Sequence, residues 1–104
     1  MDTQKLVLSL IKDDLTNTKL VLSLNALGLQ ADHYSLQLSA TIFELMGFED
    51  DDTTEPIFER YIEHSKTVTL IGSYRWHEQL EELAQEIYAV LISERKLLQI
   101  KNAG

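Results

Sequence analysis

The scarcity of turn-forming residues constrains the fold of this chain more than any other feature. Only four glycines and one proline occur among 104 residues. A β-sandwich or β-barrel needs a turn about every 8–12 residues, and most turns use these residue types. Hydrophobic residues make up 44% of the chain, so it is not a disordered one. The length is typical of one domain. We therefore predict an all-α fold in a single helical domain that covers residues 1–104.

The first predicted helix covers about residues 3–27. Apolar residues at three- and four-residue spacing predict its core face, with Thr18 and Asn25 in the polar gaps. That row contains Leu8, Ile11, Leu15 and Leu22. A break near Asp13 and Asp14 is the alternative, because Asp14 or Asn17 could cap a second helix and leave two shorter ones.

A second apolar row on the same segment predicts a dimer face. One stripe is enough for a helix inside a monomeric bundle, so a further stripe needs a second neighbour. Two copies of the chain would supply it in a symmetric pair. The possible dimer face contains Leu6, Leu10, Leu20, Leu24 and Leu27, with Val7 and Val21 beyond it.

Start and stop signals predict three further helices. Asp32 caps the second, which has an apolar face from Tyr34 onwards and ends at Gly47. Gly28 and Gly47 each precede an apolar residue, a pattern typical of the left-handed residue that ends a helix. Pro56 suits the first turn of the third helix.

Ser73 is predicted to cap a fourth helix over about residues 74–98, whose apolar stripe begins at Trp76. Residues 66–73 fit a loop, a short 3₁₀ turn or an extended stretch. The predicted architecture is a four-helix, mostly antiparallel bundle with two long and two shorter helices.

Charge and composition exclude several classes of partner. The net charge of −8 disfavours nucleic acid and anionic membrane surfaces, both of which attract basic proteins. No apolar stretch reaches the length of a membrane span or of a signal-peptide core. The chain has no cysteine, which is typical of a cytoplasmic protein. We expect a cytoplasmic protein whose partners are itself or a basic protein.

Motifs that carry catalysis or bind metals are not recognisable in the sequence. The acidic stretch at residues 49–55 does not place the glycine and the glutamate that a calcium-binding loop needs. None of the histidines follows a glutamate by three residues, as a di-iron bundle requires. We therefore predict no enzyme activity, no catalytic residue, no cofactor and no metal.

Aromatic and histidine residues form the remaining candidate site. Two tyrosines each precede a histidine by three residues, which places each pair on one face if both segments are helical. The second pair flanks an arginine and the only tryptophan, residue types that are common at interaction hot spots. The possible interaction residues are Tyr61, His64, Tyr74, Arg75, Trp76 and His77.

Three functional hypotheses follow. The first is a non-enzymatic protein-interaction module that acts as a homodimer. The second is an acidic inhibitor or adaptor that masks a basic protein. Its surface would contain Glu49, Asp50, Asp51, Asp52, Glu55, Glu59 and Glu63. The third is a small-molecule-binding or enzymatic bundle that uses the Tyr/His pairs.

Overall fold

Helices make up nearly all of the computed structural model, which describes residues 2–29 and 35–103. The α-helices are α1 (Thr3–Ala26), α2 (Ser35–Leu45), α3 (Glu55–Ser65) and α4 (Trp76–Ala103). A 3₁₀ helix, η1 (Lys66–Leu70), follows α3 directly. The predicted all-α class is confirmed, because the described residues contain no strand and the four α-helices pack against each other. The predicted cap Asp32 and Tyr34 lie outside the described residues.

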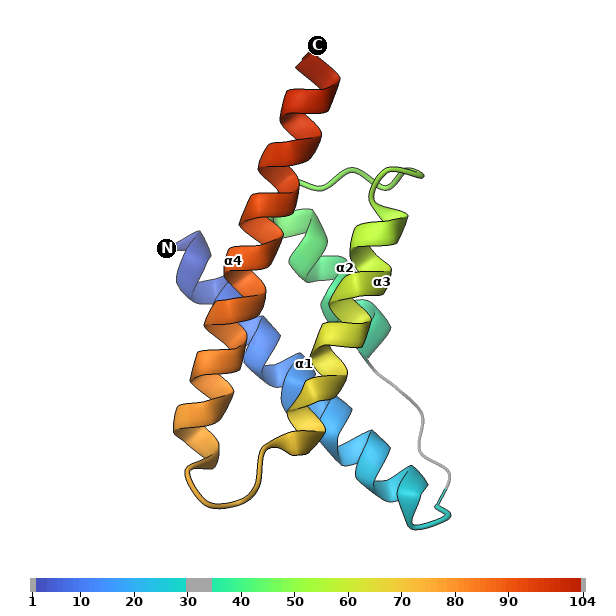
Figure 1. Cartoon of the computed structure of the whole chain (residues 1–104), viewed down its shortest axis with the longest axis vertical. Coiled ribbons are helices and arrows are strands. Elements are labelled where there is room, and N and C mark those ends of the chain that lie inside the picture. The colour runs from blue at the N-terminus through green and yellow to red at the C-terminus, as the bar shows by residue number, and fades with distance from the viewer. Residues whose placement is uncertain (1, 30–34, 104) are drawn as a thin grey trace.

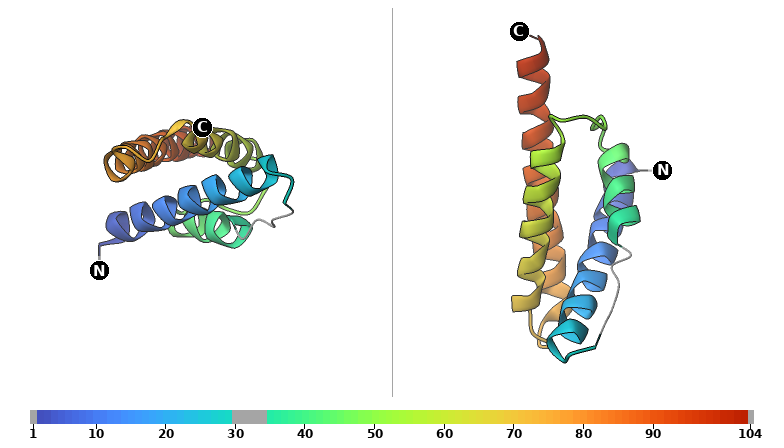
Figure 2. Two further views of the ribbon diagram at one scale, coloured as in Figure 1. Left: turned by 90° about the horizontal axis from the view of Figure 1, so that it is seen from below. Right: turned by 90° about the vertical axis from the view of Figure 1, so that its right-hand side faces the viewer.

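The helices form two layers (Figures 1 and 2). One layer contains α1 and α2, and the other contains α3 and α4. The central element is α1, since it contacts α2, α4 and η1. The molecule measures 49 × 27 × 23 Å, and the last turns of α4 extend beyond the other helices. Among residues 2–29 and 35–103, none of the helices combines the length and the hydrophobicity of a membrane span.

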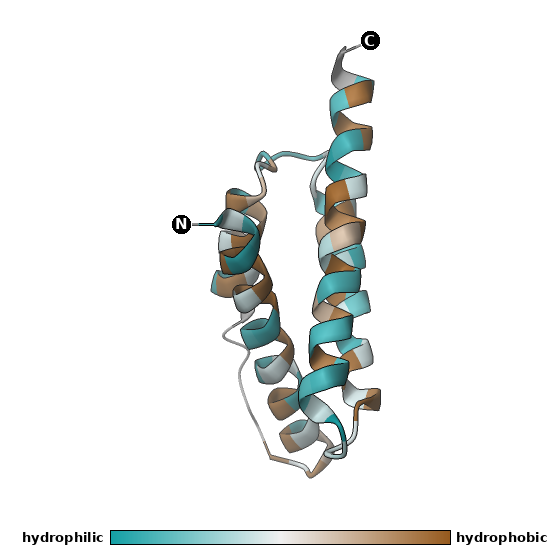
Figure 3. Cartoon of the chain, turned by 90° about the vertical axis from the view of Figure 1, so that its left-hand side faces the viewer, coloured by the Kyte–Doolittle hydropathy of each residue, from teal (hydrophilic) through white to brown (hydrophobic). Residues whose placement is uncertain are grey.

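The core lies between the two layers. The stripe predicted for α4 is buried there through Leu80, Leu83, Ala84, Ile87 and Leu91. The other helices contribute Val7, Ile11 and Leu15, Ile42 and Phe43, and Ile57 and Tyr61. The end of α4 leaves this core, and Figure 3 shows apolar and polar residues interspersed along it.

α1 is one continuous helix, so the alternative of a break near Asp14 is wrong. Its core face also differs from the predicted row. Ile11 and Leu15 are buried as predicted, but Leu8 and Leu22 are only half-buried. The helix is turned so that a neighbouring stripe at three- and four-residue spacing lies inside. That stripe contains Val7, Ile11, Asp14, Thr18 and Val21.

A hydrogen bond between α1 and α3 explains how Asp14 is buried in mid-helix. The Tyr61 hydroxyl donates to the Asp14 carboxylate at 2.5 Å, and both side chains are buried. A buried carboxylate needs such a donor. Desolvation, followed by the charge of Asp14, raises the pKa of Tyr61 well above its usual value. The hydroxyl therefore keeps its proton and remains a donor.

The two predicted glycine stops are confirmed. Gly28 and Gly47 have φ angles of +81° and +83°. After α2, the Gly47 amide donates to the Glu44 carbonyl and the Phe48 amide donates to the Phe43 carbonyl, each at 3.0 Å. This pair of bonds defines the Schellman motif. The rings of Phe48 and Phe43 lie 4.9 Å apart, which supplies the apolar contact of the motif.

The start of α4 differs from the prediction. The helix begins at Trp76 rather than near residue 74, and it ends at Ala103 rather than near residue 98. Arg75 has a φ of 60°, a left-handed conformation that cannot continue into a preceding helical turn. The first intrahelical bond runs from the Gln79 amide to the Arg75 carbonyl, so Arg75, not Ser73, occupies the cap position.

Candidate functional site

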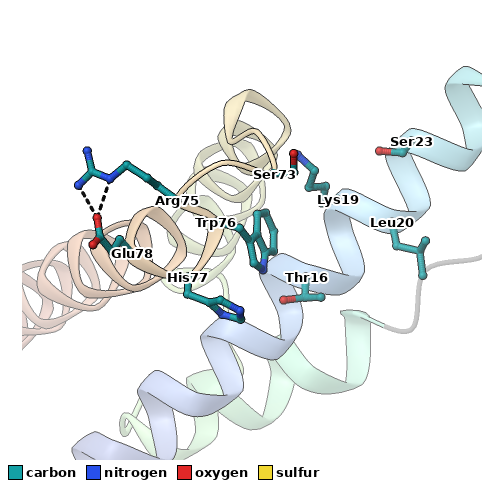
Figure 4. Close-up of a pocket in the computed structure, with 9 residues that line it drawn as sticks. All are labelled: Thr16, Lys19, Leu20, Ser23, Ser73, Arg75, Trp76, His77 and Glu78. Atoms are coloured by element: carbon teal, nitrogen blue, oxygen red, sulfur yellow. Dashed lines mark hydrogen bonds and ion pairs between the residues drawn. The ribbon is translucent and has the colours of Figure 1, made fainter.

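A cleft of about 710 Å³ lies between α1 and the start of α4 (Figure 4). We call it the α1–α4 cleft. From α1 it is lined by Thr16, Lys19, Leu20 and Ser23. From the α4 side it is lined by Ser73, Arg75, Trp76, His77 and Glu78. The cleft therefore brings together one residue of the predicted dimer face and three of the predicted interaction residues.

Trp76 forms the wall of this cleft. Its ring projects from α4 toward α1, where Thr16 and Lys19 face it (Figure 4). The Lys19 ammonium lies 5.2 Å from the ring centroid, within the range of a cation–π contact. The same ammonium donates a hydrogen bond to the Ile71 carbonyl. Lys19 thus ties α1 to both the segment after η1 and the start of α4. The half-buried Trp76 also packs at the edge of the core, as predicted for the start of its stripe.

Arg75 introduces backbone strain beside the cleft. A non-glycine residue at positive φ is uncommon, and such strain collects at functional sites. The Arg75 guanidinium pairs with the Glu78 carboxylate, which holds it on the side of α4 away from α1.

The predicted dimer face is not uniformly exposed. Leu20 and Leu27 are 57% and 76% exposed, whereas Leu6 and Leu24 are half-buried. Leu10 is half-buried and packs against the core. The exposed part of this row is therefore the C-terminal half of α1, and Leu20 lies both in the row and in the α1–α4 cleft.

The two Tyr/His pairs do not form one site. Tyr61 and His64 line a smaller cavity of about 170 Å³ between α3 and α4. The His64 Nε2 also lies 3.4 Å from a carboxylate oxygen of Glu86, which is not one of the residues that line the cavity. The expectation that Tyr74 shares a helix face with His77 is wrong, because Tyr74 precedes α4 and is 85% exposed.

The acidic stretch at residues 49–55 borders a third concave surface, of about 740 Å³, between α2 and α3. We call it the acidic groove. Glu49, Asp50, Asp51, Asp52 and Glu55 line it, and Glu44 of α2 joins them. The acidic surface predicted for an inhibitor or adaptor also included Glu59 and Glu63, and these two residues do not line the acidic groove. The Thr53 hydroxyl and then its amide lower the pKa of Asp51 by donating to its carboxylate.

Sequence reasoning missed the polar residues that α1 contributes to the α1–α4 cleft. Thr16, Lys19 and Ser23 recur at three- and four-residue spacing, which puts them on one helix side. That spacing is a usable signal, but a polar stripe of this kind is ordinary on a surface helix. No protein-family model, curated protein or solved structure matches this chain.

Proposed function

We propose that the protein is a non-enzymatic protein-interaction module that acts as a homodimer. In this proposal each copy is a mostly antiparallel four-helix bundle, and its contact surface is the C-terminal half of α1 with the adjoining α1–α4 cleft. One observation carries the proposal: Leu20 in the C-terminal half of α1 and Leu27, the residue that follows this helix, are largely exposed, and Leu20 lines the α1–α4 cleft beside Trp76. Exposed apolar side chains that gather in one region of a surface mark interaction sites.

A second copy is the partner that this surface fits best. In a twofold dimer the same row of α1 meets itself, so every apolar contact occurs twice. Complete burial of a leucine is worth roughly 1.5–3 kcal/mol, and these leucines are already partly covered. Four such side chains across two copies would therefore contribute several kcal/mol. Trp76 adds a residue type that is enriched at interface centres.

Light scattering at micromolar concentration tests the proposal. The expected mass is about twice the 11.9 kDa of one chain. The double variant Leu20→Glu with Leu27→Glu is expected to be monomeric with an unchanged helical circular dichroism signal. These two positions are suitable because neither side chain belongs to the buried core.

Leu97→Glu is the matched control. Leu97 is 57% exposed, the same fraction as Leu20, but it lies on the projecting end of α4. The control variant is expected to remain a dimer. A mass near that of one chain for the unaltered protein would refute the homodimer. Dissociation by Leu97→Glu alone would instead place the contact on α4.

A further inference from the structure

The acidic groove has a floor made of three phenylalanines. Phe43 of α2 is buried, and its ring centroid lies 4.9 Å from that of Phe48 and 5.3 Å from that of Phe58. Phe48 and Phe58 are half-buried, and all three rings line the groove. The floor therefore presents aromatic surface of the kind that takes an apolar anchor side chain.

The rim of the groove carries charge of one sign. Six exposed carboxylate side chains line it, and no lysine, arginine or histidine is among the described residues of its lining. Arg95 is close by, but it donates to the Met46 carbonyl at the end of α2. A surface of this charge attracts cationic partners and accelerates their association.

Thr54 supplies a polar group that the fold itself does not use. It occupies the N-cap position of α3, where a threonine side chain normally accepts a hydrogen bond from a helix amide. Here its backbone has a helical conformation and its side chain makes no capping bond. Thr54 is only 9% exposed and lines the groove, and its buried hydroxyl oxygen has no hydrogen-bond partner. A ligand in the groove can bond to this covered oxygen once the Thr54 side chain turns toward the groove.

We propose that the acidic groove binds a basic segment of another protein, with one apolar side chain on the phenylalanine floor and lysines or arginines along the rim. The Thr54 hydroxyl bonds to a polar group of the bound segment. Three independent features match this one ligand: the aromatic floor, the uniform charge of the rim and the unused hydroxyl. The site is separate from the α1–α4 cleft, because the start of α4 and the connection between α2 and α3 lie at opposite ends of the layered helices (Figure 1).

Binding of short synthetic peptides tests the proposal. The probes are peptides in which lysines flank a central leucine, phenylalanine or tryptophan, with a central serine as the reference. Fluorescence anisotropy is expected to show salt-sensitive binding of at least one apolar-centred peptide, and weaker binding of the serine peptide. Amide chemical-shift changes are expected at residues 43–58. The proposal is overturned if no apolar-centred peptide binds, or if the serine peptide binds equally well.

A pair of charge variants distinguishes binding in the acidic groove from a general effect of the protein's net negative charge. Asp50→Asn with Asp52→Asn removes two rim charges and leaves Asp51, which organises the loop through Thr53. Glu59→Gln with Glu82→Gln removes the same charge from exposed helix positions outside the groove. The rim variant is expected to weaken binding at least about threefold more than its control. Equal losses overturn the proposal.

Variants of Thr54 test the hydroxyl. Thr54→Val is expected to weaken binding at least about threefold without lowering the thermal midpoint, and Thr54→Ser is expected to retain affinity. Unchanged binding by Thr54→Val would contradict the role given to the hydroxyl.

Calcium is the alternative ligand for the acidic rim. If calcium alone shifts the same amides and displaces the peptide, the rim is a cation site and the peptide proposal is overturned. The monomeric Leu20→Glu, Leu27→Glu protein should still bind the peptide, so this proposal and the homodimer fail separately.

Discussion

Tyr61 joins the two layers through a buried polar contact. Its hydroxyl donates to Asp14, and its ring packs edge-on against Phe43 at 5.5 Å between centroids. One side chain therefore fixes α3 against both α1 and α2. Because burial and then the charge of Asp14 raise the pKa of Tyr61, the contact makes stability depend on pH.

The protein is expected to lose stability as the pH rises above about 10, the pKa of tyrosine in an unfolded chain. Above that value the unfolded chain releases the Tyr61 proton while the folded protein retains it, which favours unfolding. Tyr61→Phe is expected to reduce this alkaline loss. At neutral pH the same variant should be roughly 1–3 kcal/mol less stable, because it removes the donor to a buried carboxylate.

Urea unfolding at neutral and alkaline pH measures both effects. Tyr74→Phe is the control, since Tyr74 is largely exposed and its hydroxyl is not part of the core. An equal alkaline loss in Tyr61→Phe and in the unaltered protein would contradict the assignment.

Helix ends marked by glycine and proline were predictable because their chemistry is local. Gly47 and Pro56 act within one turn, so the residues around them contain the whole signal. The start of α4 was not predictable in this way, because Arg75 takes a conformation that its residue type disfavours. The core face of α1 was also missed, because a leucine-rich helix offers several stripes. Tyr61, 47 residues away, makes the Asp14 stripe the buried one.

Gly47→Ala is expected to destabilise the protein by about 1 kcal/mol, because an alanine is strained at a φ of +83°. Steric crowding does not cause this loss of stability, since an added Cβ would lie 3.8 Å from the flexible Arg95 side chain, an ordinary contact distance. Gly72→Ala is the control: its added methyl group meets open space, so stability should be unchanged or slightly higher. Thermal or urea unfolding compares the two. An equal loss in both variants would contradict the argument.

At the scale of the whole molecule, the sequence identified four of the residues that line the α1–α4 cleft but not their arrangement. Leu20 and Trp76 were both candidates, yet they were assigned to different surfaces. Their meeting depends on how α1 crosses the start of α4, which is set by packing between elements distant in the chain. The same limit applies to the acidic groove, where the carboxylates were identified and the phenylalanine floor was not.

The projecting end of α4 divides that helix into two parts whose backbone amides are expected to exchange with solvent at different rates. Leu80 to Leu91 are held in the core, whereas Leu97 and Ile100 beyond them are exposed. Amides in the first part should exchange with solvent only when the whole molecule unfolds, while those after about residue 97 should exchange by fraying from the end. Hydrogen exchange followed by mass spectrometry measures the boundary. Uniform protection along α4 in the monomeric Leu20→Glu, Leu27→Glu protein would contradict this expectation, whereas a graded profile would show that one continuous helix opens in stages.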